Sequence, residues 1–83
     1  MILAVGIDIG STYTKAVLMD ETRQVRATAL RRSGYKPAVA AAGVYEDLLE
    51  EAGVTKHDVS YIATSGYGRY MAPFRHTQIT ELT

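Results

Sequence analysis

The feature that most constrains the fold is a polar turn between two apolar stretches near the start of the chain. Residues 2–9 and 14–19 are rich in residues that pack well in β-strands, whereas residues 10–14 are all small or hydroxylated. A chain with this pattern reverses direction at the turn, and its apolar arms pair side by side. The sequence therefore predicts an antiparallel β-hairpin that holds its polar groups at one end.

The predicted turn carries several groups that bind anions. Gly10 is able to adopt backbone angles that a side chain forbids, so the amides of Ser11 and Thr12 can point at one ligand. The hydroxyls of Ser11, Thr12 and Thr14 add further donors. Gly-Ser-Thr is also ordinary turn chemistry, so composition alone leaves the phosphate-binding and the purely structural interpretations both open.

Two charged side chains flank this turn. Lys15 places a compact positive charge, suited to phosphate, in the second arm. Asp8 lies at the end of an otherwise apolar strand and offers the hard oxygen ligands that Mg²⁺ or its bound waters prefer. An acid before a turn often caps backbone amides, so a structural role for Asp8 stays open as well.

Length and charge limit the classes of protein to consider. The 83 residues allow a single domain of marginal size. Nine basic and nine acidic side chains give no net charge, which argues against nucleic acid or an anionic membrane as a partner. The absence of cysteine excludes disulfides and iron-sulphur ligands within this segment. The apolar start contains Asp8 and lacks a basic leader and a cleavage site, so we expect a cytoplasmic protein without a signal peptide.

Residues 24–30 are predicted to form a third strand, because apolar and polar residues alternate there. One face of this strand is wetter than the other, as expected towards the edge of a sheet. A basic cluster surrounds the strand, formed by Arg23, Arg26, Arg31 and Arg32. Such a cluster either marks a solvated edge that discourages pairing with other chains or forms a patch for phosphate or a partner.

A helix is predicted over residues 37–52. Pro37 suits the first helical position, and Gly53 suits the position just past the helix end. The acidic residues of this segment fall largely on one side, which is the side expected to face solvent. The stripe expected to face the core consists of Val39, Ala42, Tyr45, Leu48, Leu49 and Ala52.

A fourth strand is predicted over residues 59–63, after a short capping turn formed by Thr55 and Asp58. A strand that follows a helix usually returns parallel to an earlier strand through a right-handed crossover, so we expect it beside the first strand. Its carboxyl end then emerges at the same rim as Asp8 and Gly10, where α/β sheets commonly bind ligands.

The residues after this strand form a second candidate binding turn. Gly66 and Gly68 permit a tight turn, and Arg69 offers a planar fork of donors for phosphate. Turns of this composition are commonplace, so the motif is weak on its own. Residues 69–83 are too few and too mixed for a structural assignment.

The order of these motifs resembles the actin, sugar kinase and Hsp70 superfamily of ATPases. Within it, the chain resembles the BadF/BadG/BcrA/BcrD ATPases, which include activators of 2-hydroxyacyl-CoA dehydratases and ATPase subunits of benzoyl-CoA reductases. Residues 6–15 look like the first phosphate loop of this family, residues 65–69 like its Thr-Gly-Tyr-Gly-Arg turn, and residues 79–82 like its Ile-(Ser/Thr)-Glu-(Ile/Leu) segment. Ser65 replaces the usual Thr and keeps a hydroxyl, and Tyr13 stands where a small residue is common.

The resemblance implies an α/β fold, namely a fragment of the amino-terminal lobe of a ribonuclease H-like, actin-like ATPase. In this fold a three-stranded antiparallel meander is followed by a helix and by a fourth strand parallel to the first. The implied cofactor is ATP or ADP with Mg²⁺, which Asp8 would hold through water. Asp8 and Lys15 are the implied catalytic residues. The implied nucleotide contacts are Gly10, Ser11, Thr12, Tyr13, Thr14, Lys15, Ser65, Gly66, Gly68 and Arg69.

The resemblance also implies a function for a longer parent protein. That parent would use ATP hydrolysis to drive the transfer of an electron from an iron-sulphur cluster to a dehydratase or reductase partner that acts on a CoA ester. The family's cluster cysteines, second phosphate loop and adenosine pocket are missing from this sequence. We therefore expect residues 1–83 to be part of an amino-terminal lobe that binds nucleotide weakly and does not hydrolyse it.

Two alternative functions remain. The first phosphate loop also suits a sugar-kinase-type phosphotransferase lobe, although the Gly-Tyr-Gly-Arg turn after the fourth strand is not typical of sugar kinases. The other alternative is a noncatalytic, actin-like interaction module. A partial sheet exposes apolar surface and an unpaired edge, so a homo-oligomer is also expected to be possible.

Overall fold

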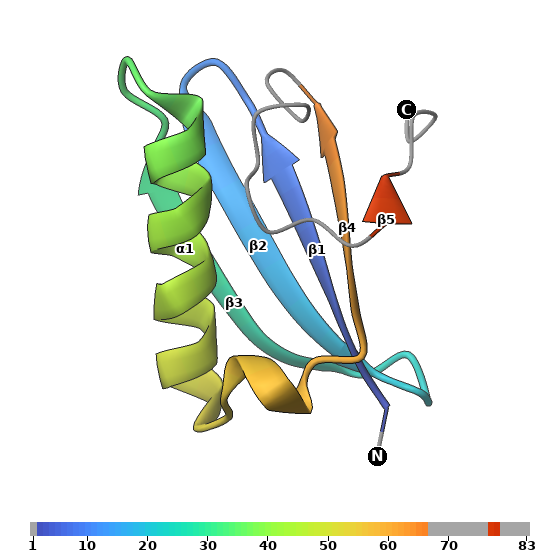
Figure 1. The fold of residues 1–83 in the computed structure, drawn as a ribbon. Helices are drawn as coiled ribbons and strands as arrows, with labels where there is room; N and C mark the ends of the chain where they lie inside the picture. Colours follow the sequence, from blue (N-terminus) through green and yellow to red (C-terminus); the bar gives the residue numbers. More distant parts are fainter. Residues whose placement is uncertain (1, 67–76, 79–83) are drawn as a thin grey trace.

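The computed structural model of the protein describes residues 2–66 and 77–78. Its elements form one layer of strands with helices on one side (Figure 1). In chain order they are β1 (Leu3–Ile9), β2 (Tyr13–Asp20), β3 (Val25–Arg32), α1 (Pro37–Ala52), the 3₁₀-helix η1 (Lys56–Asp58), β4 (Tyr61–Gly66) and β5 (Thr77–Gln78).

The sheet has the strand order β3-β2-β1-β4-β5. Strands β1, β2 and β3 form an antiparallel meander, and β4 lies parallel to β1 after the crossover through α1. This arrangement confirms the predicted fold class. The short strand β5 pairs in parallel with β4 and was not expected, because two residues carry no readable periodicity.

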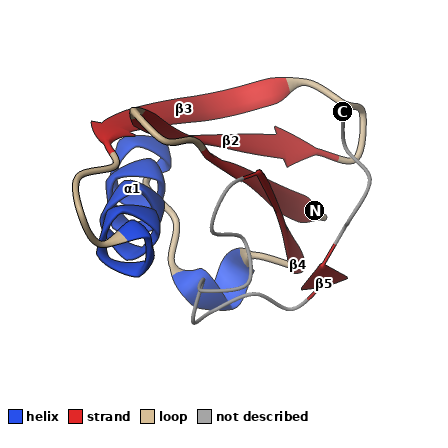
Figure 2. Cartoon of the chain, turned by 90° about the horizontal axis from the view of Figure 1, so that it is seen from above, coloured by secondary structure: helices blue, strands red, loops and turns tan. Residues whose placement is uncertain are grey.

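Of the described elements, helices cover one face of the sheet and none covers the other, which is called the open face below (Figure 2). Figure 2 shows α1 and η1 on the same side of the sheet. The core lies between α1 and this face, because alternate residues of each strand point to opposite sides. The largest of its fully buried apolar side chains are Val5, Ile7, Ile9, Leu18, Val44, Leu48 and Ile62. Neither of the helices that the structure describes is long and apolar enough to cross a membrane.

The boundaries of α1 follow from residues with special backbone properties. Pro37 occupies the first helical turn, where its missing N–H costs no hydrogen bond. Gly53 ends the helix in the left-handed conformation, with φ of 70°, which a residue with a Cβ atom rarely adopts. The predicted capping turn also forms, because the amide of Thr55 donates to the Asp58 carboxylate at 2.9 Å.

The rotation of α1 about its axis differs from the predicted one. Val39 was expected in the core, but it is 61% exposed. The buried side chains of α1 are Ala40, Ala41, Val44, Tyr45 and Leu48, of which Tyr45 and Leu48 belong to the predicted stripe. Leu49 and Ala52, also in that stripe, are partly buried against the core. Because the first half of this helix is apolar on nearly all sides, its sequence is compatible with two stripes at three- and four-residue spacing. Packing against β2 and β3 selects between them.

The strand boundaries differ modestly from those expected. Strand β4 begins and ends two to three residues later than predicted, and the buried Val59 precedes it. Strand β3 continues two residues past the expected end at residue 30. The basic residues of β3 lie on an edge strand, as the sequence indicated.

Candidate functional site

The carboxyl ends of β1 and β4 and the start of β2 meet at one end of the sheet (Figure 1). Asp8 of β1 lies directly opposite Lys15 of β2 and also opposite Ser65 of β4. The side chains of directly opposite residues stand on the same face of a sheet. Because Ile7 and Ile9 are buried under α1, the Asp8 side chain must lie on the open face. Three residues predicted from separate motifs are thus brought together.

Asp8, Lys15 and Ser65 border a shallow groove of about 240 Å³ on this open face. The remaining lining is apolar and mostly small, and consists of Gly6, Ile7, Val17 and Ala63. A Cβ atom placed on Gly6 would have no atom within 4 Å, so the space above Gly6 is open. The groove therefore has a carboxylate, a lysine ammonium group and a hydroxyl around a small apolar floor.

Among the residues that the structure describes, no side chain forms an ion pair with either charged group of the groove. Within the described ranges, the ion pairs are Arg26 with Asp20 and Arg31 with Asp47. Lys15 and Asp8 are both exposed and take part in neither pair. A ligand that carries negative charge and a divalent cation is the kind that would satisfy both groups at once.

The turn between β1 and β2 needs glycine for a reason other than the predicted one. Gly10 was expected to supply unusual backbone angles, but the described glycines with positive φ are Gly34 and Gly53. Instead, the Gly10 amide donates to the carbonyl oxygen of Tyr13 at 2.9 Å. A Cβ atom on Gly10 would lie 2.7 Å from that oxygen, which is closer than real contacts allow. Gly10 is therefore required by the close approach of two backbone segments.

The side chains at the tip of this turn are exposed. Ser11 and Thr12 face solvent, and within residues 2–66 and 77–78 their hydroxyls have no hydrogen-bond partner. Tyr13 is 48% exposed on the open face. The guanidinium of Arg32 lies 5.9 Å from the centre of the Tyr13 ring, within the range of a cation–π contact. The turn thus presents hydroxyl and backbone donors to solvent.

Thr14 is placed differently from the other predicted contacts. Its side chain is completely buried, and its Oγ1 lies 2.8 Å from the hydroxyl of Ser33. Neighbouring residues of a strand alternate between faces, so Thr14 and Lys15 cannot both reach the groove. Ser33 was not among the predicted site residues.

Several other predicted site residues can be placed only in part. Gly66 ends β4 beside Ile9, at the same rim as the turn. Gly68 and Arg69 lie outside the described residues, as does the predicted segment at 79–82. In the part of the chain that the structure describes, no cluster of three acidic or histidine side chains can hold a metal ion. A single carboxylate such as Asp8 suits Mg²⁺ that keeps its waters and binds mainly to phosphate oxygens.

Comparison with known proteins identifies the family to which this sequence is similar. The sequence profile of the BadF/BadG/BcrA/BcrD ATPase family matches residues 5–83. A benzoyl-CoA reductase subunit of Thauera aromatica is 38% identical in an alignment 76 positions long that covers 87% of this chain and 27% of that protein. The activator of lactoyl-CoA dehydratase of Anaerotignum propionicum is 30% identical over 78 residues, which are 94% of this chain and 30% of that protein.

A solved structure also has this fold. It is the activator of the 2-hydroxyisocaproyl-CoA dehydratase from Clostridium difficile with bound ADPNP, an ATP analogue. It superimposes with a TM-score of 0.83 and 28% sequence identity over 93% of this chain and 28% of that chain. The chain thus spans less than a third of the length of each of these three proteins.

Proposed function

The chain belongs to the BadF/BadG/BcrA/BcrD ATPase family, and we propose that it binds the phosphates of ATP or ADP with Mg²⁺ where β1, β2 and β4 meet. One observation carries this proposal. Asp8, Lys15 and Ser65 lie on three neighbouring strands beside an exposed Ser-Thr turn, and the two charged groups are not paired with each other. The ADPNP bound by a structural relative supports the same ligand class.

Each group of the site has a role that its chemistry suits. The amides and hydroxyls of Ser11 and Thr12 donate to phosphate oxygens, and the Lys15 ammonium neutralises their charge. Asp8 accepts hydrogen bonds from waters on Mg²⁺. When bound, Mg²⁺ supplies positive charge that stabilises the developing charge during phosphoryl transfer. Ser65 borders the site on the side of β4, where its hydroxyl can donate to a phosphate oxygen.

Other predicted contacts complete the proposal. Tyr13 lies beside the turn with its ring exposed, and it can pack against the nucleotide. Gly66 permits close approach of the backbone at the end of β4. Gly68 and Arg69 are proposed to donate to phosphate from the second turn, as the family resemblance implies. Thr14 is buried, and it is proposed to hold the turn in place from the core and not to touch the nucleotide.

The chain carries only part of a catalytic site. Hydrolysis needs a group that orients the attacking water and a second set of phosphate donors. We propose that these belong to a longer parent, in which hydrolysis of ATP to ADP and phosphate drives electron transfer to a CoA-ester dehydratase or reductase. The electron would come from an iron-sulphur cluster, whose ligands cannot come from this cysteine-free sequence. The parent is proposed to act in the cytoplasm, without nucleic acid or membrane partners.

The proposal is tested by titrating the ¹⁵N-labelled chain with Mg·ADPNP and following amide chemical shifts. We expect shifts confined to the turn and the neighbouring strand ends, with a Kd on the order of 1 mM for half a site. Lys15→Gln should weaken binding about tenfold, because a charge-assisted contact is lost. Lys56→Gln is the matched control, since Lys56 is exposed on η1 at the opposite end of the sheet (Figure 1).

Two outcomes would overturn the proposal. If the turn amides do not shift, or if Lys15→Gln and Lys56→Gln bind equally well, the groove is not the phosphate site. If the chain alone binds tightly and releases phosphate from Mg·ATP, it holds more than half a site. Asp8→Asn adds a further check, because it should remove the Mg²⁺ dependence of binding while leaving nucleotide binding without Mg²⁺ nearly unchanged.

A further inference from the structure

Ser33 is a buried polar residue between β3 and α1 that connects to three points of the β1–β2 turn. It is 6% exposed. Its hydroxyl donates to the carbonyl oxygen of Gly10 at 2.5 Å, and its amide donates to the carbonyl oxygen of Thr12 at 2.9 Å. The same hydroxyl oxygen lies 2.8 Å from the hydroxyl of Thr14. One residue therefore holds both ends of the turn tip.

The direction of these hydrogen bonds follows from counting protons. A serine hydroxyl has one proton, and that of Ser33 is used on the Gly10 carbonyl, which can only accept. The hydroxyl of Thr14 must therefore donate to Ser33. The result is a one-way chain of donors from Thr14 through Ser33 to Gly10. Removal of the Ser33 hydroxyl takes away the hydrogen-bond partner of both the buried Thr14 hydroxyl and the Gly10 carbonyl, whereas removal of the Thr14 hydroxyl leaves Ser33 bonded to Gly10.

These hydrogen bonds fix the orientation of a peptide unit in the turn. The carbonyl of Gly10 and the amide of Ser11 belong to one planar trans peptide, so they point in opposite directions. Because the carbonyl points at the buried Ser33, the amide of Ser11 points away from it, out of the protein interior. That is the orientation in which a backbone amide can donate to an anion in solvent.

We propose that Ser33 and Thr14 are positioning residues that hold the Gly10–Thr12 turn ready for phosphate before the nucleotide binds. The inference rests on the proposed phosphate site and names the residues that act on it from the covered face of the sheet. Neither hydroxyl touches the ligand. A turn that is already oriented loses less conformational freedom on binding. The hydrogen bonds of Ser33 and Thr14 therefore raise the affinity for phosphate without adding a contact to it.

The first test needs no nucleotide. Amide hydrogen exchange is measured by NMR for the unaltered protein and for Ser33→Ala, Thr14→Val and Ser60→Ala. We expect Ser33→Ala to speed exchange at Gly10 about fivefold to tenfold, the effect of one lost buried hydrogen bond. Amides in the middle of the sheet, such as those of Val5 and Leu18, should change less than twofold. Ser60→Ala is the matched control at the other end of the sheet.

Thr14 supplies a second pair of variants that guards against misfolding of Ser33→Ala. Thr14→Val keeps the shape of the side chain and removes its hydroxyl. It should therefore raise the exchange rate of the Gly10 amide about threefold. Thr14→Ser keeps the hydroxyl and should restore exchange to within about twofold of the original value. If the Gly10 amide exchanges at the same rate in all variants, Ser33 and Thr14 do not hold the turn. The same conclusion follows if exchange becomes faster by the same factor at every amide of the sheet.

The second test measures binding of Mg-pyrophosphate by the same variants. We expect Ser33→Ala to raise the Kd about tenfold and Thr14→Ser to leave it nearly unchanged. Unaltered affinity in Ser33→Ala, together with faster exchange at Gly10, would overturn the role in phosphate binding. If the unaltered protein does not bind pyrophosphate, the proposed function fails and the phosphate role fails with it, while exchange still decides whether Ser33 holds the turn.

Discussion

At the scale of single residues, Gly10 and Gly6 give opposite expectations for the same substitution. A Cβ atom on Gly10 would lie 2.7 Å from the Tyr13 carbonyl oxygen, whereas one on Gly6 would meet nothing within 4 Å. We expect Gly10→Ala to destabilise the protein by about 1–3 kcal/mol because the turn must open. Gly6→Ala should stabilise it by about 0.5–1 kcal/mol, since alanine loses less backbone freedom.

Urea unfolding of both variants tests this expectation. Gly6→Ala serves as the matched control, because it changes the same atom in the same part of the chain. Equal changes in the free energy of unfolding would show that the close approach at Gly10 does not determine the turn. Gly6→Ala also places a methyl group in the groove, so its Kd for Mg·ADPNP measures how near the ligand comes to the floor.

Asp20 makes the stability of the hairpin formed by β2 and β3 depend on pH. Its carboxylate accepts hydrogen bonds from the Thr22 hydroxyl at 2.6 Å and from the amides of Thr22 and Gln24. These bonds, that of the Thr22 hydroxyl above all, hold the pKa of Asp20 below its ordinary value of 3.8. A lowered pKa in the folded state means that the stabilisation is complete well above pH 3.8 and is lost as the pH falls through the folded-state value.

Asp20→Asn should therefore lower the free energy of unfolding at about pH 6 and have a smaller effect near pH 3. The measurement is urea unfolding at both values. Glu51→Gln, at an exposed position on α1, is the control and should change little at either pH. A constant difference between Asp20→Asn and the original protein at both pH values would contradict the assignment.

Residue patterns predicted much of the candidate site but not all of it. The prediction that Asp8 and Lys15 flank the turn was possible because their order in the sequence fixes their place on the hairpin. The burial of Thr14 could have been inferred from strand alternation, since it follows from period two once Lys15 is placed on the open face. Ser33 could not, because its contact with Gly10 joins residues 23 positions apart.

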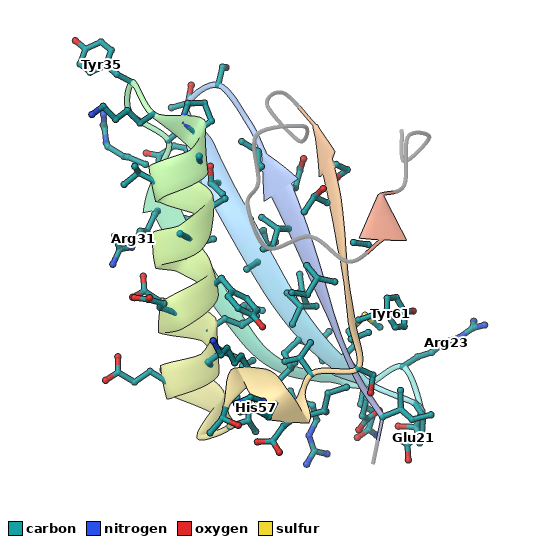
Figure 3. All side chains as sticks on the ribbon, viewed as in Figure 1. Glu21, Arg23, Arg31, Tyr35, His57 and Tyr61 are labelled. Carbon is teal, nitrogen blue, oxygen red and sulfur yellow. The ribbon has the colours of Figure 1, made fainter. Side chains whose placement is uncertain are left out.

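At the scale of elements, a single arginine joins the edge strand β3 to α1. The guanidinium of Arg31, which is labelled in Figure 3, forms two hydrogen bonds to the carboxylate of Asp47, at 2.6 and 3.1 Å. It also lies against Gly43. A Cβ atom on Gly43 would lie 2.5 Å from Nη1 of Arg31. The hydrogen bond and charge of Arg31 also hold the pKa of Asp47 below its ordinary value.

Gly43→Ala should displace Arg31 and raise the pKa of Asp47 towards 3.8. The net change in the free energy of unfolding should be below about 1 kcal/mol, because alanine gains about as much in helix propensity as the disturbed exposed ion pair is worth. The measurement is an NMR pH titration of the Asp47 carboxyl, with Ala42→Gly as the control on the neighbouring position. An unchanged pKa in Gly43→Ala would show that Arg31 keeps its place.

Element boundaries and element rotation were not equally predictable. Pro37 and Gly53 act locally through backbone geometry, so the sequence specifies where α1 begins and ends. The side of α1 that faces the core depends on packing between distant elements, which local periodicity does not specify for a helix rich in alanine. The exposure of Val39 is the result.

At the scale of the whole molecule, the two faces of the sheet differ in what covers them. The helices lie on one face, and Tyr13, Leu30 and Tyr61 are exposed on the other. Figure 3 shows the Tyr61 side chain projecting near the start of β4. A sheet is normally packed on at least one further layer when its second face is this apolar. We therefore expect copies of the chain to associate through the open face.

This expectation is tested by sedimentation at several concentrations with two matched variants. Leu30 is 60% exposed on the open face, opposite Lys15, and Val39 is 61% exposed on α1. Leu30→Lys should raise the dissociation constant of the oligomer at least about tenfold, since burial of a leucine side chain is worth about 1.5–3 kcal/mol. Val39→Lys adds the same charge on the covered side and should leave it unchanged. A chain that stays monomeric at every concentration, or variants with equal effects, would show that the open face does not drive self-association.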